Sequence, residues 1–292
     1  MLRAVLLTVP NVSEGADRAV LDELVESTRP LRLLDLHSDP DHGRSVLTLA
    51  GRQGQVAPAL ERLAAAAARL LDVSAHPGRH PHVGALDVAP VVHTDEALRG
   101  AAVAEALTAG ALIGAVAGVP VFLYGALATG AERAERAALR AGGPAALAER
   151  MRTGELAPDY GPPRLHPSAG ATLVSARPPL VAFNVDLDSD DVELAKRIAA
   201  RLRESGGGPP GVRAIGLALP ARGRAQVSFN VHDHRAVPLR DLVAAVRAVA
   251  PVAEAELVGL APAAAFDGFP ADVPLRGFDP QRHLIENALR SP

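Results

Sequence analysis

Six of the ten histidines in this 292-residue sequence lie between positions 37 and 93, and they are the first residues that can do chemistry. The densest group is His76, His80 and His82, in the segment HPGRHPHVG. A histidine titrates near neutral pH, which suits it to act as a general base and then as a general acid. The other two interpretations are metal binding and solvated loop side chains without a role.

The prolines in this segment argue against the metal interpretation. His76 and His80 are four residues apart, a spacing that brings two ligands to one face of a helix. However, a proline follows each of them directly, and a residue before proline avoids the helical conformation. We therefore expect no metal site, and acid–base catalysis and a passive loop remain open.

Polar residues at the ends of two predicted strands form a second group. Asn11 ends the first strand and opens a helix, where it either presents an amide to a ligand or belongs to a capping turn. Asp35, His37 and Asp39 follow the next apolar strand, and Asp39 begins a turn sequence, Asp-Pro-Asp. Asp35, at the end of that strand, is the carboxylate best placed to point into a cleft.

Predicted strands and helices alternate along the chain and must position these residues. In the first half we expect strands at 4–9, 31–36, 45–49, 86–92 and 119–124, and helices at 16–27, 55–71 and 94–117. In the second half we expect strands at 180–185, 212–219, 225–231 and 254–258, and helices at 189–204 and 239–249. The capping positions are expected at Ser13 and Glu14, at Thr94 and at Ser189.

Each half follows the order β-α-β-β-α-β, which is the ferredoxin-like order. The predicted fold class is therefore α+β, with two such subdomains at 1–177 and 178–292. The stretch 125–177 is expected to connect them, with a helix at 131–141 followed by loops whose prolines prevent regular structure. The tail is expected to end in a helical turn at 280–289.

Composition excludes several classes of function. Hydrophobic residues make up 48%, charged residues 22% and aromatic residues 3%, and the net charge is −3. This suits a globular core and predicts no nucleic-acid partner. Cysteine is absent, which excludes disulfides and thiolate catalysis. The uncharged stretch 106–131 is interpreted as a buried helix and a strand, so no membrane is expected. The first eleven residues lack a secretory signal, and we expect a cytoplasmic protein.

Seven segments, in order along the chain, resemble the glutamate formimidoyltransferase family. They are VPNVSEG at 9–15, HSDPDHGRSV at 37–46, HPGRHPHVGALDV at 76–88, PDYG to AR between 158 and 177, VAFN at 181–184, AQVSFN at 225–230 and ELVGL at 256–260. The resemblance implies two α/β subdomains with a folate-binding groove between them, in a homodimer. It implies transfer of a formimino group from N-formimino-L-glutamate to tetrahydrofolate, in histidine breakdown and one-carbon metabolism. Some members continue into a cyclodeaminase domain, and this chain resembles the form without one.

The resemblance also assigns roles to residues. The catalytic histidine of the family falls on His80, which would take a proton from folate N5 and then give one to the departing glutamate nitrogen. No permanently bound cofactor is implied, since tetrahydrofolate is a co-substrate. We expect carboxylate and amide oxygens around the cationic amidine and arginine forks on the glutamate carboxylates. The expected substrate-binding residues are Asn11, Asp35, His37, Asp39, Arg44, His82, Arg177, Asn184 and Asn230.

The sequence departs from the family pattern at five places, one of which is Pro90-Val-Val-His93 where the motif ends in PFxP. His82 stands where the motif has arginine, Arg79 where it has an acidic or small residue, Gly43 where it has asparagine, and His37 where an acid is common. These departures keep two alternatives open beside an active formimidoyltransferase. One is a catalytically weak folate-binding paralogue, and the other is a one-carbon transferase that uses a formyl donor.

Overall fold

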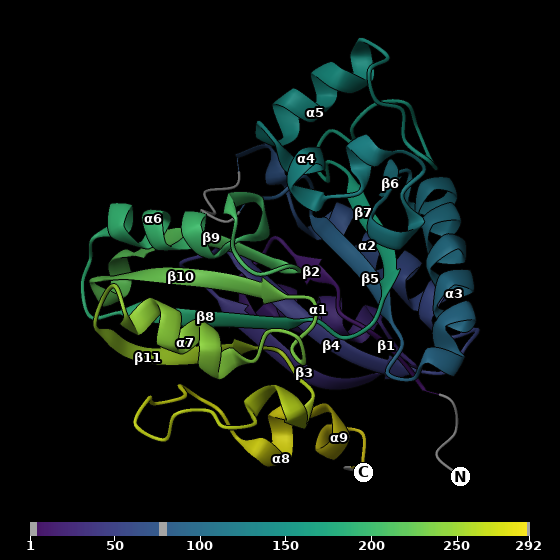
Figure 1. Ribbon diagram of the computed structural model, residues 1–292. Helices are drawn as coiled ribbons and strands as arrows, with labels where there is room; N and C mark the ends of the chain where they lie inside the picture. The colour runs from purple at the N-terminus through teal and green to yellow at the C-terminus, as the bar shows by residue number, and fades with distance from the viewer. Residues whose placement is uncertain (1–4, 76–80, 291–292) are drawn as a thin grey trace. The chain divides into compact units, whose positions relative to one another are not determined.

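A computed structural model describes residues 5–75 and 81–290, and the chain divides into two compact units, Met1–Pro178 and Pro179–Pro292. Each unit has its own β-sheet with helices packed on it (Figure 1). The predicted mixed α+β architecture with two sheets is confirmed. Each unit is described by itself below.

The first unit is built on a seven-stranded sheet. Its strands are β1 (Leu6–Thr8), β2 (Asn11–Val12), β3 (Arg32–Asp39), β4 (Arg44–Gly51), β5 (Leu86–Val92), β6 (Val121–Leu123) and β7 (Thr172–Arg177). Its helices are α1 (Arg18–Ser27), α2 (Val56–Leu70), α3 (Arg99–Leu112), α4 (Arg136–Arg140) and α5 (Gly143–Arg152), and a π-helical turn, Ile113–Ala117, extends α3.

The two short strands β1 and β2 act as one interrupted strand, because each pairs with β4 on one side and β5 on the other. The predicted single strand at 4–9 is thus wrong in its bounds, since the chain turns at Val9 and Pro10 and pairing resumes at Asn11. Beyond β5 the sheet continues with β7 and then β6, and both of these pairings are parallel. All seven residues of β5 are buried, as expected for a strand covered on both faces.

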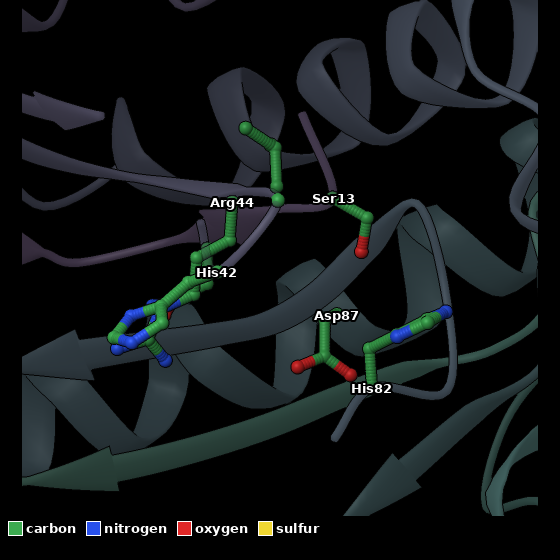
Figure 2. Close-up of a pocket in the computed structure, with 8 residues that line it drawn as sticks. Ser13, His42, Arg44, His82 and Asp87 are labelled. Carbon is green, nitrogen blue, oxygen red and sulfur yellow. The ribbon is translucent and has the colours of Figure 1, made fainter. Parts of the chain in front are cut away.

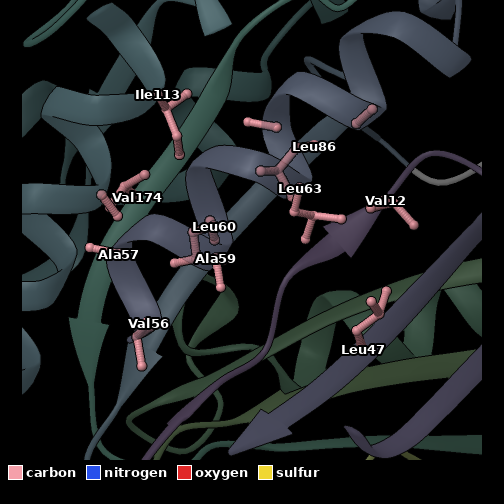
Figure 3. Close-up of a cluster of buried hydrophobic side chains, with 14 of the residues drawn as sticks. Val12, Leu47, Val56, Ala57, Ala59, Leu60, Leu63, Leu86, Ile113 and Val174 are labelled. Atoms are coloured by element: carbon pink, nitrogen blue, oxygen red, sulfur yellow. The ribbon is translucent and has the colours of Figure 1, made fainter. Parts of the chain in front are cut away.

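One face of this sheet is covered by α1, α2 and α3, and the other by α4 and α5 over β5, β6 and β7. The apolar residues of α2 recur at helical spacing, so Val56, Leu60 and Leu63 all point inward with no exposed area. They meet Leu47 of β4 and Leu86 of β5 in the core (Figure 3). Burial of each such side chain stabilises the fold by roughly 1.5–3 kcal/mol.

The helical stretch Glu96–Ala117 is long and apolar enough to cross a membrane by length and composition alone. Core helices of soluble proteins pass the same test, so a single helix of this kind is weak support for a membrane span. Here Ala102, Ala106, Ala109 and Ile113 belong to the buried core that packs on the sheet. The expected helix at 94–117 is therefore present as a core helix, although it begins two residues later, at Glu96.

The second unit is built on a four-stranded antiparallel sheet with the strand order β11-β8-β10-β9. Its elements are β8 (Val181–Leu187), α6 (Val192–Leu202), β9 (Val212–Leu219), β10 (Arg224–Val231), α7 (Leu239–Arg247), β11 (Val252–Val258), α8 (Pro280–His283) and α9 (Ile285–Ala288). The predicted order β-α-β-β-α-β is confirmed here. Phe183 and Phe229 on one sheet face pack against Ile198 of α6 and Leu242 of α7.

The region between 125 and 177 is more regular than predicted. Thr172–Arg177 forms β7, a central strand of the first sheet, and Gly143–Arg152 forms α5. Pro144 begins this helix rather than breaking it, because proline at the first helical turn loses no hydrogen bond that the helix needs. The helix expected at 131–141 is shorter, since only Arg136–Arg140 is α-helical.

The predicted helix caps are wrong by a few residues. Asp17 caps α1 by accepting from the amides of Ala19 and Val20, and Asp191 caps α6 by accepting from Leu194. Likewise Asp95, and not Thr94, caps the helical turn that leads into α3. An aspartate follows each expected cap within four residues, and its carboxylate is the stronger acceptor for amides at the positive end of a helix.

Candidate functional site

A small pocket in the first unit collects residues from three segments that the sequence singled out. It is lined by Asn11, Val12, Ser13, His42, Gly43, Arg44, His82 and Asp87, and is partly open to solvent. Figure 2 shows Ser13, Asp87 and His82 on one part of the lining and His42 with Arg44 on another. The pocket thus offers a hydroxyl, two imidazoles, a guanidinium and a carboxylate.

The turn between β3 and β4 positions His42 and Arg44. Asp39 accepts a hydrogen bond from the backbone amide of His42 at 3.0 Å, and its other oxygen lies 3.5 Å from His42 Nδ1. Gly43 has a φ of +63°, which a glycine adopts without strain. Asparagine tolerates this conformation better than most residues, so the departure from the family's asparagine at Gly43 preserves the turn.

Ser13 fixes one wall of the pocket rather than capping a helix. Its hydroxyl donates to the carbonyl of Gly84 at 2.8 Å, and its amide donates to the carbonyl of Ala85. At Gly84 an added Cβ would lie 2.0 Å from the carbonyl oxygen of Ala171. Only a glycine therefore allows the segment before β5 to approach the segment before β7 so closely.

Asp87 is the acidic centre of this region. It is 4% exposed, accepts from the amide of Val83 at 2.8 Å and forms an ion pair with Arg140 of α4. The side chain of Arg140 is itself only 10% exposed. A buried carboxylate and a buried guanidinium thus neutralise each other across 53 residues of sequence.

Arginines outnumber carboxylates around the pocket. The pKa of Arg44 is lowered to about 10, first by burial and then by the charges of Arg140 and Arg136. The charges of Asp39 and Asp87 raise it again, but only in part. A desolvated cation with this environment favours an anionic ligand. The pocket is therefore suited to bind carboxylate or phosphate groups.

A second pair of arginines flanks Tyr124, which follows β6. The guanidinium of Arg136 lies 5.7 Å from the centre of the Tyr124 ring, and Arg177 is close enough to the same tyrosine for an electrostatic interaction. Burial lowers the pKa of Arg177 to about 10, and Arg136 contributes to this decrease. Burial also lowers the pKa of Arg136.

The second unit carries its own polar surface, on the sheet face opposite α6 and α7. Side chains alternate between faces along a strand, so Asn184 and Asp186 share this face with Gln226 and Asn230. Asn184 donates to Glu256 at 3.1 Å, and Gln226 donates to Asp186 at 2.7 Å. Burial raises the pKa of Asp186.

Comparison with known proteins shows which family the chain belongs to. The family model described as "Formiminotransferase domain, N-terminal subdomain" matches residues 5–177, and "Formiminotransferase domain" matches residues 182–268. The chain belongs to the formiminotransferase family.

Relatives of this formiminotransferase include both short and long proteins. The glutamate formimidoyltransferase of Streptococcus pyogenes serotype M1 is 37% identical over 96% of this chain and 97% of its own length. That of Thermoplasma acidophilum is 34% identical, with 96% of each chain covered. The formimidoyltransferase-cyclodeaminase of Sus scrofa is 41% identical over 87% of this chain, which spans 49% of the pig protein. The protein is an enzyme, a transferase.

Within this formiminotransferase, the structure brings together only some of the predicted site residues. Asn11, Arg44 and His82 line the pocket, and Asp39 contacts its His42. Arg177 lies beside Tyr124. Asn184 and Asn230 share one sheet face in the second unit.

The remaining predicted residues do not line the pocket. Asp35 and His37 lie on β3, half-buried, opposite Thr48 and Val46 of β4. His80 lies outside the described residues, so its predicted catalytic role stays a prediction.

Sequence reasoning missed five residues of this region: Ser13, His42, Asp87, Arg136 and Arg140. The first three lie inside the family segments, and their place in those segments was a usable signal. Arg136 and Arg140 lie in a stretch interpreted as a connection, and only the packing of α4 on the sheet brings them to Asp87 and Tyr124.

Proposed function

We propose that this formiminotransferase transfers the formimino group from N-formimino-L-glutamate to N5 of tetrahydrofolate. The observation that carries the proposal is the near full-length similarity to two proteins named glutamate formimidoyltransferase. The pocket supports it, because both substrates carry glutamate carboxylates and arginines outnumber carboxylates around Arg44.

The proposed mechanism uses one histidine for two proton transfers. N5 of tetrahydrofolate attacks the amidine carbon, and His80 takes the proton that N5 loses. The tetrahedral intermediate then releases glutamate, whose nitrogen receives the proton from His80. His82, two residues further along the chain, lines the pocket together with Ser13 and Asp87, which supports a reaction at this end of the first sheet.

The carboxylates near the pocket are proposed to favour the cationic amidine. Asp39 and Asp87 are both buried, so a positive group that enters the pocket meets them without competing water. Asp35, His37, Asn184 and Asn230 stay predicted substrate contacts. The chemistry needs no metal or redox cofactor, since both proton transfers and the group transfer conserve oxidation state.

The ferredoxin-like assignment is also a proposal. In the second unit, the antiparallel order β11-β8-β10-β9 supports it. In the first unit, β3-β4-β1-β5 repeats the same order, and β7 and β6 extend it. The folate groove between two subdomains at 1–177 and 178–292, the homodimer, the cytoplasmic location and the role in histidine breakdown stay predictions of the resemblance.

An assay with purified protein tests the proposal. Tetrahydrofolate and N-formimino-L-glutamate should give 5-formiminotetrahydrofolate and glutamate. Mass spectrometry detects both products. Folate binding without turnover would favour the paralogue, and turnover with a formyl donor alone would favour the formyl transferase; either result contradicts the proposal.

The role of His80 is tested separately. His80→Ala should lower kcat about 100-fold or more, the usual contribution of a general base. His232→Ala, an exposed histidine of the second unit, serves as the matched control and should keep the full rate. A fully active His80→Ala enzyme would remove the catalytic assignment and leave the transfer reaction intact.

A further inference from the structure

Helix α4 presents two arginines to the same region of the first sheet. Arg136 and Arg140 are four residues apart and therefore share one face of the helix. Arg140 reaches Asp87, which lines the pocket, and Arg136 lies over the ring of Tyr124. Both arginines thus come from a segment outside the family motifs and end beside pocket residues.

These arginines differ from their neighbours in how their donors are used. Arg150 gives two hydrogen bonds to the carbonyls of Ala138 and Leu139, and Arg133 pairs with Asp159. Arg150 thus joins α5 to α4, and Arg133 joins the turn before α4 to the segment that contains Asp159. Among the described residues, by contrast, Arg136 has a ring contact and no hydrogen bond, and the Nε of Arg140 and of Arg177 is buried without a hydrogen-bond partner.

The charges of this cluster do not balance. Arg44, Arg136, Arg140 and Arg177 contribute four positive charges, whereas Asp39, Asp87 and the exposed Glu135 contribute three negative ones. An N–H group that is buried without an acceptor raises the free energy of the folded protein, unless a ligand supplies the acceptor. The buried Nε atoms of Arg140 and Arg177 are two such N–H groups.

We propose that Arg136 and Arg140 of α4, together with Arg44 and Arg177, form a carboxylate-binding site that holds a glutamate group of the substrates. The proposal rests on the proposed function and adds to it the residues that recognise the substrate. The arginine forks bind carboxylate oxygens in pairs, and the Tyr124 ring fixes the plane of the Arg136 fork. Asp87 holds Arg140 in place and leaves its Nε for the ligand.

Two sources offer this chemistry: the glutamate of N-formimino-L-glutamate and the glutamate tail of folate. Isothermal titration calorimetry with the full-length protein distinguishes them. N-acetyl-L-glutamate represents the first source. Folic acid against pteroic acid, which lacks the tail, represents the second.

Arg136→Gln is the decisive variant, because Arg136 has no buried carboxylate that its loss would leave unbalanced. We expect it to weaken binding of N-acetyl-L-glutamate, or of folic acid but not pteroic acid, about 10- to 100-fold, as one lost charge-assisted pair predicts. KM for the corresponding substrate should rise by a similar factor, with kcat within about threefold. The affected ligand identifies the source.

Arg140→Lys is the second variant, because lysine keeps the charge that balances Asp87 and loses the planar fork. This variant should weaken binding of the same ligand. Arg152→Gln on α5, an exposed arginine paired with Glu149, is the matched control and should leave binding unchanged. If Arg136→Gln keeps wild-type affinity for N-acetyl-L-glutamate and for folic acid, the site is not there. Calorimetry needs no turnover, so this result is distinct from a failure of the proposed reaction.

Discussion

The two units differ in how the charged side chains on their sheets are balanced. In the second unit, Arg276 lies within 4 Å of three acids, at 2.6 Å from Glu256, 3.5 Å from Glu254 and 3.9 Å from Asp186. Arg222 and Arg224 add two further pairs with the same acids. Three arginines thus face three carboxylates, and the charges of this cluster are balanced within the unit.

In the first unit, four arginines share two buried carboxylates and the exposed Glu135, and Arg140 pairs with one acid among the described residues, Asp87. A balanced cluster stabilises a sheet without needing a ligand, while a surplus of buried positive charge prepares a surface for an anion. This difference is consistent with the anion site proposed for the first unit. Four measurements test this difference between the units.

The largest expected effect is on folding stability, at the buried pair of Asp87 and Arg140 in the first unit. Asp87→Asn removes the only acidic partner of Arg140 among the described residues and leaves a buried cation uncompensated. We expect a loss of about 3–5 kcal/mol in the free energy of unfolding, measured by urea denaturation. Glu149→Gln, which breaks the exposed Glu149–Arg152 pair, should cost less than about 1 kcal/mol. Equal costs would show that the Asp87 pair is not buried in solution.

The next largest effect is expected in the pH dependence of ligand affinity. Arg44 and Arg177 have pKa values lowered to about 10, and only the protonated forms attract a carboxylate. Affinity for N-acetyl-L-glutamate should therefore hold from pH 8 to 9 and fall as pH rises through about 10, by up to tenfold per pH unit for each arginine involved. Calorimetry across pH 8–10.5 measures this. A constant affinity up to pH 10.5 would show that the pKa values of Arg44 and Arg177 are not lowered to this extent.

A smaller effect is expected for the corresponding change in the second unit. Glu256→Gln removes one of three acids near Arg276, and the new amide oxygen still accepts from Asn184. We expect a loss of about 1 kcal/mol, the usual net value of one hydrogen bond. Urea denaturation under the conditions used for Asp87→Asn gives the comparison. A loss as large as that of Asp87→Asn would remove the distinction between the units.

The smallest effect is expected at Asp186. Burial raises the pKa of this carboxyl, so the folded protein binds its proton more tightly than the unfolded chain and loses stability as pH rises through the folded pKa. Asp186→Asn removes that penalty and keeps the acceptor for Gln226. The variant should be slightly more stable than wild type at pH 7, and the gain should vanish as pH falls towards 4. A variant that is less stable at pH 7 would show that the arginines outweigh burial.

The fold was predictable where hydrophobic periodicity was undisturbed. All four strands and both main helices of the second unit lie where alternation and helical spacing place them. In the first unit, β7 escaped prediction, because its apolar residues follow a loop with four prolines between 158 and 167. Helix α5 escaped because Gly142, Gly143 and Pro144 are also typical of a turn.

The candidate site was predictable where one segment carries several polar residues. Asn11, Arg44 and His82 were expected in the site and line one pocket. Arg136 and Arg140 were not expected, because their partners Tyr124 and Asp87 lie 12 and 53 residues away, and no spacing rule connects them. Such contacts depend on how α4 packs on the sheet, which a single sequence does not specify.

The strand β7 has a consequence for the order in which this protein becomes complete. It lies between β5 and β6 although it follows both in the chain, and its pairing with β5 joins residues about 85 positions apart. During synthesis, the sheet stays open along one edge of β5 until residue 177 has left the ribosome. Contacts between such distant residues also slow folding. The arginines of α4 and Arg177 therefore reach Asp87 and Tyr124 only at the last step of building the first unit.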